Sequence, residues 1–494
     1  MNKVVCHYRG YLRILLFGCV FFLAGCQSDD NADTGNIDAD NSGIGGTGIT
    51  RGAISGFGSV IVNGIEFNTE NATFTRDSLP ANEQDFLLGD VVSIDATYDA
   101  SGKFAMAKSM SYRDMLEGPV GSTPGNNTFE MLGQEIVVDS ATTFANFNRL
   151  NELKTHNFLE ISGYHGSDGK VYATRVELKA DTYVPGMILE LKGRVAAVDT
   201  ARKTFNIEGL TVDYANAQLD HIPNGVPVAG DYVEITSHRN FDGEILLAEI
   251  IVSTSETLPL TPGSGANIEG LVTRIDSPSA FNINGLDVAV TATSSFFNGT
   301  AEDLNLNTKV QVIGTTDDQG VLLAEEVHLL RIGEECIKAT LEPNPVDLES
   351  QRLEILGVDV KTGPRTVFQD KSDRQQINLS LSDLSEGEFL RVCGDVDADN
   401  ALLALRIERH NPYPHTRVKG FTTEQDAVLR VFKMLDILFS TSSETIYQDF
   451  NGKEISAAVF FNRLAADHAL VTAKGDLIGN SPYEIRASQL KLEP

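Results

Sequence analysis

Residues Arg51–Phe67, with the sequence RGAISGFGSVIVNGIEF, decide the fold of this chain. Apolar residues alternate with small or polar ones on both sides of a glycine-rich centre, which predicts two strands joined by a bend. The pair Asn63-Gly64 predicts a tight hairpin turn into a third strand, because both residue types accept a positive φ. Gly56 and Gly58 are expected to let the strands bend, and the stretch is therefore a β-hairpin rather than a glycine-rich binding loop.

Versions of this hairpin return five more times along the chain. The first strand carries a glycine or alanine at one fixed place: Gly52, Gly118, Gly193, Gly270, Ala339 and Gly420. The second strand ends in a turn glycine at Gly64, Gly133, Gly209, Gly285 and Gly357, whereas in the sixth unit Leu435 is expected in that place. Self-similarity of this kind predicts a tandem array of one small unit.

Two further strands follow in every unit, with alternating apolar and polar residues, as in VVSIDATY (residues 91–98) and YVEITSH (residues 232–238). A less regular insert precedes them and looks helical in FANFNRLNELKT (residues 144–155) and ISAAVFFNRLAADH (residues 455–468). Five strands with such an insert predict an all-β chain of about six small barrels of the OB type, with an SH3-like barrel or a small open sandwich as the alternative.

The expected boundaries follow from the repeats and from short segments between them, several of which contain proline. They are a signal peptide at 1–25, an acidic and glycine-rich tether at 26–49, and repeats at 50–114, 115–182, 187–256, 265–332, 335–411 and 415–494.

The first 26 residues have the pattern of an exported, lipid-anchored protein. Lys3, Arg9 and Arg13 precede an apolar run, Ile14–Ala24, that is too short to span a bilayer. The run leads into Leu-Ala-Gly-Cys, which resembles the bacterial lipobox, so Cys26 is predicted to carry the lipid that binds the membrane. By resemblance to lipoprotein sorting in Gram-negative bacteria, the Gln after this Cys favours the outer membrane, with the face left open.

Composition excludes one class of partner. The chain has 494 residues and a formal net charge of −30. A polyanion of this kind is repelled by phosphate backbones, so nucleic acid is not expected as a partner. We interpret the charge as a source of solubility and colloidal repulsion.

The mature chain keeps two cysteines, Cys336 and Cys393, both in the fifth repeat. They fall on its first and fourth strands, which are neighbours in an OB barrel, and an oxidising compartment then favours a disulfide over two buried free thiols. Asp395, Asp397 and Asp399 resemble half a calcium loop, but position twelve is Arg406, so a hairpin tip is the preferred interpretation.

No residue pattern predicts catalysis, a cofactor or a metal. The histidines form no HExxH pair, and His410 and His415 merely flank a proline-containing linker. No nucleophile elbow and no phosphate-binding loop with lysine is present in the sequence. We therefore expect no catalytic, cofactor-binding or metal-binding residue.

The tether end GIGGTGI (residues 43–49), the hairpin RGAISGFGSVIVNGIEF and the lipobox together resemble bacterial lipoproteins built from repeats of domain of unknown function 5666. The resemblance is closest over Gly43–Asp114 and looser in the later repeats. It implies repeat identity and localisation, and it brings no site residues with it.

Three hypotheses follow for function. The first is a non-catalytic binding or scaffold module of the cell envelope, since OB-type barrel faces bind oligosaccharides or oligonucleotides and the charge argues against the latter; the ligand would be a glycan or a protein. The second is an enzyme or enzyme accessory with a site between barrels, which requires a cleft with perturbed carboxylates. The third is a structural spacer.

Overall fold

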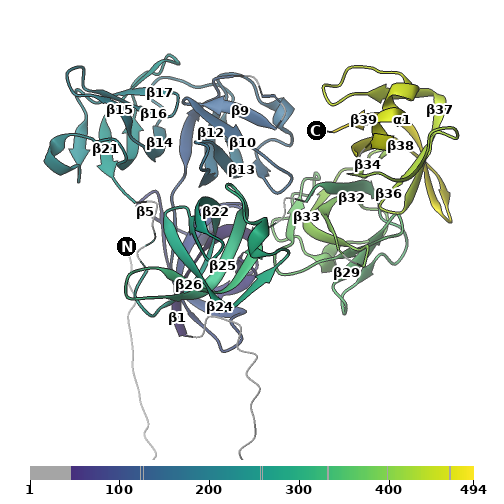
Figure 1. The fold of residues 1–494 in the computed structure, drawn as a ribbon, viewed down its shortest axis with the longest axis horizontal. Helices are drawn as coiled ribbons and strands as arrows, with labels where there is room; N and C mark the ends of the chain where they lie inside the picture. Colours follow the sequence, from purple (N-terminus) through teal and green to yellow (C-terminus); the bar gives the residue numbers. More distant parts are fainter. Residues whose placement is uncertain are drawn as a thin grey trace, which may run out of the picture. The chain divides into compact units, whose positions relative to one another are not determined.

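The computed structural model describes residues 46–493 except 123, 126, 256, 257, 259, 331, 332, 398, 467 and 468. The predicted signal peptide, Cys26 and most of the predicted tether lie outside these residues. The described chain is almost entirely β and consists of six consecutive small units of five to eight strands, which we call barrels 1 to 6 (Figure 1).

The first three barrels have the following elements. Barrel 1 comprises β1 Gly46–Gly56, β2 Val60–Val62, β3 Ile65–Asn68, β4 Thr73–Arg76, β5 Leu79–Ala81, the 3-10 turn η1 Glu83–Asp85, β6 Val91–Tyr98 and β7 Phe104–Tyr112. Barrel 2 comprises β8 Leu116–Pro119, β9 Thr128–Met131, β10 Gln134–Val137, β11 Thr143–Ala145, η2 Leu150–Glu152, β12 Phe158–His165 and β13 Val171–Ala180. Barrel 3 comprises β14 Leu189–Arg194, β15 Ala196–Asp199, β16 Thr204–Ile207, β17 Leu210–Asp213, β18 Gln218–Asp220, η3 Pro223–Gly225, β19 Tyr232–Ser237, β20 Ile245–Leu247 and β21 Ile250–Ser253.

The last three barrels repeat the same order. Barrel 4 comprises β22 Gly265–Ser277, β23 Ala280–Ile283, β24 Leu286–Phe297, η4 Ala301–Asp303, β25 Lys309–Thr316 and β26 Leu322–Leu329. Barrel 5 comprises β27 Glu335–Thr340, β28 Val346–Asp347, β29 Arg352–Ile355, β30 Val358–Lys361, β31 Val367–Asp370, η5 Leu381–Asp383, β32 Phe389–Val396 and β33 Leu402–His410. Barrel 6 comprises β34 Thr416–Phe421, β35 Thr423–Asp426, β36 Val431–Met434, β37 Ile437–Gln448, the helix α1 Ala457–Ala466, β38 Leu470–Asn480 and β39 Tyr483–Leu492.

The strand order closes barrels 1 and 4 completely. In barrel 1, β1 pairs with β2, β2 with β3, β3 with β7 in parallel, β7 with β6, and β6 again with β1. Barrel 4 repeats this circuit through β22, β23, β24, β26 and β25. This confirms the predicted all-β class and small-barrel architecture, and closure removes the sheet edges that would otherwise be free to pair with other chains.

The hairpin turns of the repeats have the geometry that the sequence predicts, with one correction. Asn63 and Gly64 both have positive φ (54° and 78°), as a type I′ turn requires. In barrel 6 the turn residues are Leu435 and Asp436, with φ of 51° and 59°. The residue in the place of the turn glycine is therefore Asp436, since Leu435 occupies the place of Asn63.

Two other expectations are wrong in detail. Gly46–Ile49, predicted as tether, belongs to β1, because it pairs with β6 from Gly46 opposite Tyr98 onward. The insert of barrel 2 is not a helix and forms only the single 3-10 turn η2, whereas the insert of barrel 6 forms the ten-residue helix α1. Among the described residues, no helix is long and apolar enough to cross a membrane.

The fourth strands of barrels 2, 4, 5 and 6 carry a glycine where they lie close to the fifth strand. Gly163 lies at a β-bulge against β13, and a Cβ there would be 2.3 Å from the Tyr172 carbonyl oxygen. The same bulge occurs at Gly314, Gly394 and Gly475, where the Cβ would lie 2.0 to 2.2 Å from a carbonyl oxygen. The bulge bends the fourth strand around the barrel and brings these glycines close to the backbone of the fifth strand. Barrel 1 has the same bulge with Ala96 in this place, opposite Ala107.

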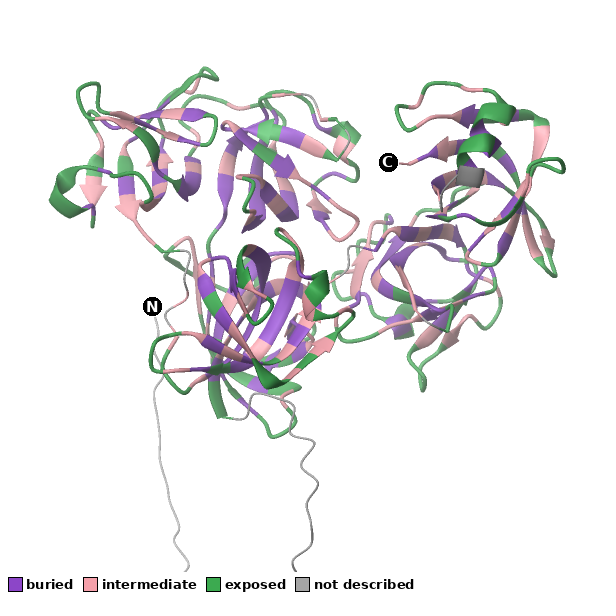
Figure 2. Cartoon of the chain, in the orientation of Figure 1, coloured by how far each residue is buried: buried purple, intermediate pink, exposed green. Residues whose placement is uncertain are grey.

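The barrels associate through their first strands. β1 pairs with β22 in parallel, β8 with β14 and β27 with β34 both antiparallel. Figure 2 shows buried residues alternating with exposed ones along the strands. Barrels 2 and 3 share one continuous apolar core, as do barrels 5 and 6, whereas barrels 1 and 4 have separate cores.

The bulge predicts that a side chain at the position of Gly163 lowers the stability of the protein. Gly163→Ala should lower the free energy of unfolding by about 1–3 kcal/mol, because the added methyl group meets backbone rather than a movable side chain. Gly125→Ala, in the same barrel, is the control, since a Cβ there has open space around it. Chemical denaturation followed by circular dichroism measures both, and equal stability of the two variants would contradict the steric explanation.

Candidate functional site

Barrel 1 carries a groove of about 800 Å³ beside its β6–β7 hairpin. Phe104 and Met106 stand on the outer face of β7, with 53% and 49% of their surface exposed. They lie opposite Glu66 and Asn68 of β3 in the parallel β3–β7 pairing. The groove thus places an aromatic ring and a flexible apolar side chain beside polar groups on an open surface.

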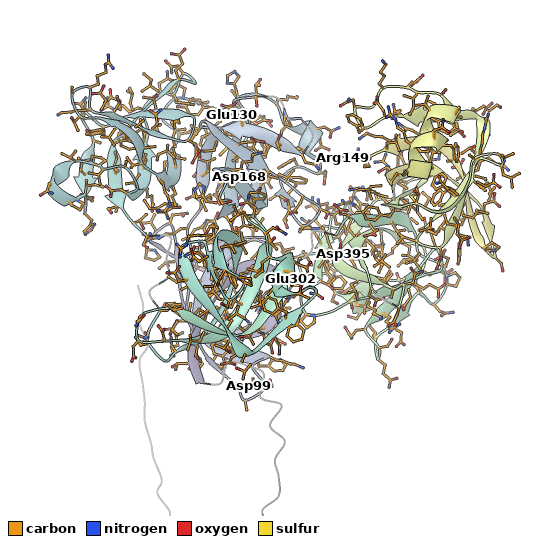
Figure 3. All side chains as sticks on the ribbon, in the orientation of Figure 1. Asp99, Glu130, Arg149, Asp168, Glu302 and Asp395 are labelled. Atoms are coloured by element: carbon orange, nitrogen blue, oxygen red, sulfur yellow. A yellow bond between two sulfur atoms is a disulfide. The ribbon has the colours of Figure 1, made fainter. Side chains whose placement is uncertain are left out.

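Carboxylates surround this apolar strip. Glu66, Glu70, Glu83 and Asp99 all line the groove, and Figure 3 labels Asp99 at the hairpin. Asp99 accepts hydrogen bonds from the Ser101 hydroxyl group, which lower the pKa of this carboxyl. The groove therefore offers hydrogen-bond acceptors in fixed positions beside an aromatic face, and it attracts donors rather than anions.

A buried ionic cluster joins barrels 1 and 2. The fully buried Arg175 of β13 donates to Asp90 of barrel 1 and to Glu160 and Glu177 of barrel 2. The Tyr112 hydroxyl group donates to Glu160 over 2.8 Å. All three nitrogens of Arg175 thus donate to a carboxylate, and the bonds from Arg175 to Asp90 and from Tyr112 to Glu160 cross the junction.

The electrostatics of Glu160 show the strength of this cluster. Burial opposes its ionisation, but Arg175, Arg76 and Lys179 outweigh burial and lower the pKa of Glu160 to about 2. The Arg76 guanidinium also lies over the Tyr112 ring, 4.2 Å from its centroid. Burial raises the pKa of the Asp90 carboxyl in the same cluster, against the opposing effect of Arg175 and Arg76.

A second group of carboxyls lies where barrels 1, 2 and 3 meet. Oxygens of Asp77, Asp114 and Glu190 all lie within 4.8 Å of one another. The Lys192 ammonium group donates to Asp114 over 2.8 Å and therefore already supplies the positive charge that a cation would bring. We interpret the group as a carboxyl cluster balanced by Lys192 and by protons.

Protons are retained in this cluster to unusually high pH. Burial and the Asp114 charge raise the pKa of Glu190 to about 9 and that of Asp77 to about 6. Burial, with Asp114 and Glu160, raises the pKa of Glu117 to about 8. Like charges at short distance and desolvation both disfavour ionisation, which explains the common direction of the three shifts.

A cleft of about 620 Å³ opens beside this cluster. Arg113, Asp114, His165 and Lys192 line it, together with residues of barrels 1 to 4, whereas Glu190 does not. Sequence reasoning missed both the cleft and the cluster, because their members lie on different repeats and share no local pattern.

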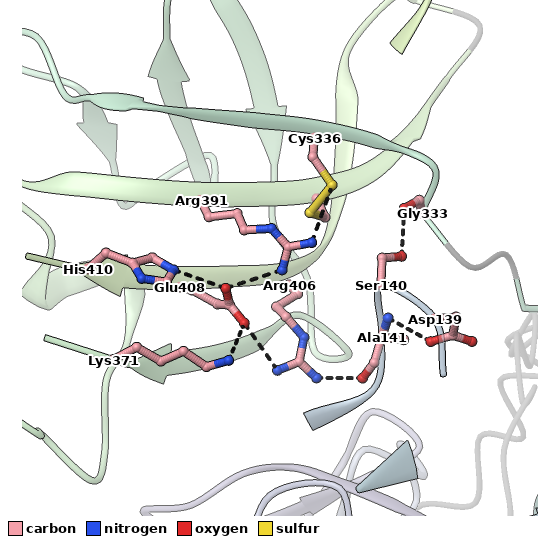
Figure 4. The surroundings of a disulfide bond; sticks show 11 residues. Asp139, Ser140, Ala141, Gly333, Cys336, Lys371, Arg391, Arg406, Glu408 and His410 are labelled. Atoms are coloured by element: carbon pink, nitrogen blue, oxygen red, sulfur yellow. Dashed lines mark hydrogen bonds and ion pairs between the residues drawn. A yellow bond between two sulfur atoms is a disulfide. The ribbon is translucent and has the colours of Figure 1, made fainter. Parts of the chain in front are cut away.

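The structure joins Cys336 and Cys393 in a disulfide, and the two residues lie directly opposite each other on β27 and β32 (Figure 4). Beside it, the buried Glu408 accepts from Arg391 over 3.2 Å and lies 3.0 Å from Lys371. Burial opposes ionisation of Glu408, but the surrounding cations hold its pKa well below the usual range. The disulfide therefore borders a second buried ionic cluster.

The residues considered and set aside in the sequence analysis have partners in the structure. Asp397 accepts from the backbone amides of Asp399 and Ala401, as at a hairpin tip, and contacts the Lys361 ammonium at 2.6 Å. His410 lies 3.1 Å from Glu408, and His415 lies 2.7 Å from Asp476. Cys26 lies outside the described residues.

Comparison with known families gives one match. The family model described as "Domain of unknown function (DUF5666)" matches residues 49–105, 117–177, 192–251, 269–328 and 346–408, which is more than half of the chain. Barrel 6 lies outside the matched stretches. No curated protein matches the sequence.

The Arg175 cluster predicts a large loss of stability. Arg175→Met should lower the free energy of unfolding by about 3–5 kcal/mol, because Asp90 and Glu160 would stay buried without their main counter-charge. Arg113→Met serves as control, since 53% of the Arg113 side chain is exposed. Chemical denaturation measures both variants, and a loss at Arg175 no larger than at Arg113 would contradict the assigned role.

The carboxyl cluster predicts that the stability of the protein falls as pH rises. The folded state retains a proton on Glu190 up to about pH 9, whereas an unfolded chain releases it near its ordinary pKa of 4.5. The unfolded state therefore binds fewer protons in this window, and stability falls as pH rises through it.

Glu190→Gln removes this titration, so its melting temperature should fall less than that of the wild type between pH 6 and pH 9. Glu244→Gln, on the exposed surface of the same barrel, is the matched control. Scanning calorimetry across the pH range measures the difference. Parallel pH curves for the wild type and Glu190→Gln would show that Glu190 does not hold the proton.

Proposed function

The chain belongs to the family of domain of unknown function 5666, and from this premise we propose that it is a non-catalytic binding scaffold of the cell envelope whose groove on barrel 1 takes a glycan. The groove carries the proposal: Phe104 offers a flat apolar face for the C–H side of a sugar ring, and the neighbouring carboxylates accept from its hydroxyl groups. Because these acceptors are acidic, a neutral glycan fits better than an anionic one.

The contacts between barrels support the proposal that the protein is a scaffold. First-strand pairing and the buried Arg175 cluster hold neighbouring barrels in fixed contact. A ligand-binding surface gains from such rigidity because less conformational entropy is lost on binding. A pure spacer would need the same junctions but would leave the exposed Phe104 without a role.

One specific observation favours the alternative that the protein is an enzyme. The cleft between barrels borders carboxyls with raised pKa, and such pairs are typical of general acid–base catalysis. Glu190 does not line the cleft, however, and would need a change in structure to reach a substrate there. We therefore place this function second.

The groove is tested by binding of the full-length, detergent-purified protein to an array of neutral and acidic envelope glycans. Phe104→Ala should weaken binding of the best neutral glycan at least tenfold, or about 1.4 kcal/mol, through loss of the apolar face. Phe450→Ala, an exposed phenylalanine of barrel 6, should leave binding unchanged. Equal binding by both variants, or no neutral glycan bound at all, would refute the groove as the site.

The lipid anchor is a separate prediction, motivated by the lipobox. Cys26→Ala should move the protein from the membrane to the soluble fraction of fractionated cells, because no thiol would remain at the cleavage site to carry lipid. Cys19→Ala, in the same apolar segment, should stay in the membrane. Retention of Cys26→Ala in the membrane fraction would refute the anchor.

A further inference from the structure

A second pocket, of about 520 Å³, lies where barrels 1, 4 and 5 meet, and Arg365 forms part of its wall. Arg365 stands in the loop between β30 and β31, and its side chain packs over Gly64 of barrel 1, with Cγ 3.6 Å from the place of a Cβ there. The loop thus carries a guanidinium from barrel 5 to the first hairpin of barrel 1.

The pocket floor is a chain of buried amides. Asn63 Nδ2 donates to Asn267 Oδ1 over 3.0 Å, and Gln311 Nε2 donates to the same oxygen over 2.6 Å. Gln311 Oε1 in turn accepts from Arg365 Nη2. Since a neutral amide oxygen takes this donor, the floor fixes the position of the guanidinium without neutralising it.

Arg365 is partly buried and differs in this respect from the buried arginines Arg175 and Arg409. Arg175 contacts three carboxylates, and Arg409 contacts two. Among the described residues, no carboxylate lies within ion-pair distance of Arg365, and its nearest acidic neighbours, Glu269 and Glu326, are engaged with Lys309 and His328 at 2.8 and 2.7 Å.

Local charge in the pocket is opposite to that of the chain. The lining includes Lys103, Lys361 and Arg365 against the single carboxylate Glu326, in a protein of net charge −30. Burial lowers the pKa of Arg365, and Glu269 and Glu326 offset this in part. An external anion would stabilise a partly buried cation that has no carboxylate partner.

The residues that line the pocket restrict which kind of anion it can bind. Lys361 is already paired with Asp397 and Asp399, and Lys103 is exposed to solvent, so Arg365 is the one partly buried cation of the described lining without a carboxylate partner. This favours a monoanion over a phosphate dianion, and a planar carboxylate matches a guanidinium with two parallel hydrogen bonds. Ser101 and Thr362 donate to Asp99 and to the Gln351 carbonyl, so their hydroxyl oxygens are acceptors for a ligand, and Ile65, Ile313 and Leu403 offer apolar contacts.

We propose that this pocket binds the carboxylate of an acidic sugar, a uronic acid unit, with Arg365 as its anchor. The pocket is distinct from the barrel 1 groove, although both border the β6–β7 hairpin: Asp99 and Phe104 line the groove, and Ser101–Lys103 line the pocket. The proposal stands independently of neutral-glycan binding in the groove.

The test titrates the full-length protein with D-glucuronate, D-glucose and inorganic phosphate by calorimetry. Glucuronate should bind at least tenfold more tightly than glucose, and more tightly than phosphate. Arg365→Met should weaken glucuronate binding at least tenfold, Arg365→Lys should weaken it less, and Arg352→Met, a partly exposed arginine of the same barrel, should leave it unchanged. Phe104→Ala should also leave it unchanged, which separates this pocket from the groove.

Three results would overturn the proposal. Equal affinity for glucose and glucuronate would show that the carboxylate is not recognised. Tighter binding of phosphate than of glucuronate would show that the pocket prefers another anion. Undiminished glucuronate binding by Arg365→Met would remove the anchor. If Arg365→Met fails to fold, the affinity of the wild type for glucuronate is measured at increasing salt concentration instead. A carboxylate held by Arg365 should bind more weakly as ionic strength rises. An affinity that does not depend on salt would refute the proposal.

Discussion

A buried guanidinium is the constraint on which the arrangement of barrels 1 and 2 depends. Removing the charge of Arg175 from water is unfavourable by several kcal/mol unless carboxylates replace the lost hydration. Glu160 and Glu177 lie in the same barrel as Arg175, whereas Asp90 comes from barrel 1, so the compensation is complete only when the two barrels are in contact. The charge therefore specifies a partner surface, whereas apolar burial alone would tolerate several.

The fold of each barrel could be predicted largely from local sequence. A turn of the Asn63-Gly64 kind, alternation along the fourth strand and the order of five strands depend on residues close together in the chain. The two errors have different causes, one in the turn itself and one in distant strands. Leu435 adopts a positive φ, which its residue type does not predict. Gly46–Ile49 has a polar, glycine-rich sequence but is ordered by pairing with β6 and β22.

The sites could not be predicted in this way. Phe104 and Glu66 are far apart in sequence but opposite in the β3–β7 pairing, and Gln311 and Arg365 lie on different barrels. Their meeting depends on which barrels associate, and a repeat that occurs six times gives no indication of which copies pair. The disulfide was accessible to sequence reasoning because both cysteines belong to one barrel, whose strand order was already inferred.

The parallel pairing of β1 with β22 has a mechanical consequence. The chain enters the described structure at Gly46, directly at the end of β1, so a pull on the preceding segment acts along this strand. β1 is bonded to β6 on one side and to β22 on the other, and a force along the strand loads both rows of hydrogen bonds together. Tension applied at this end is thus shared at once between barrel 1 and barrel 4, although more than 200 residues of chain separate their first strands.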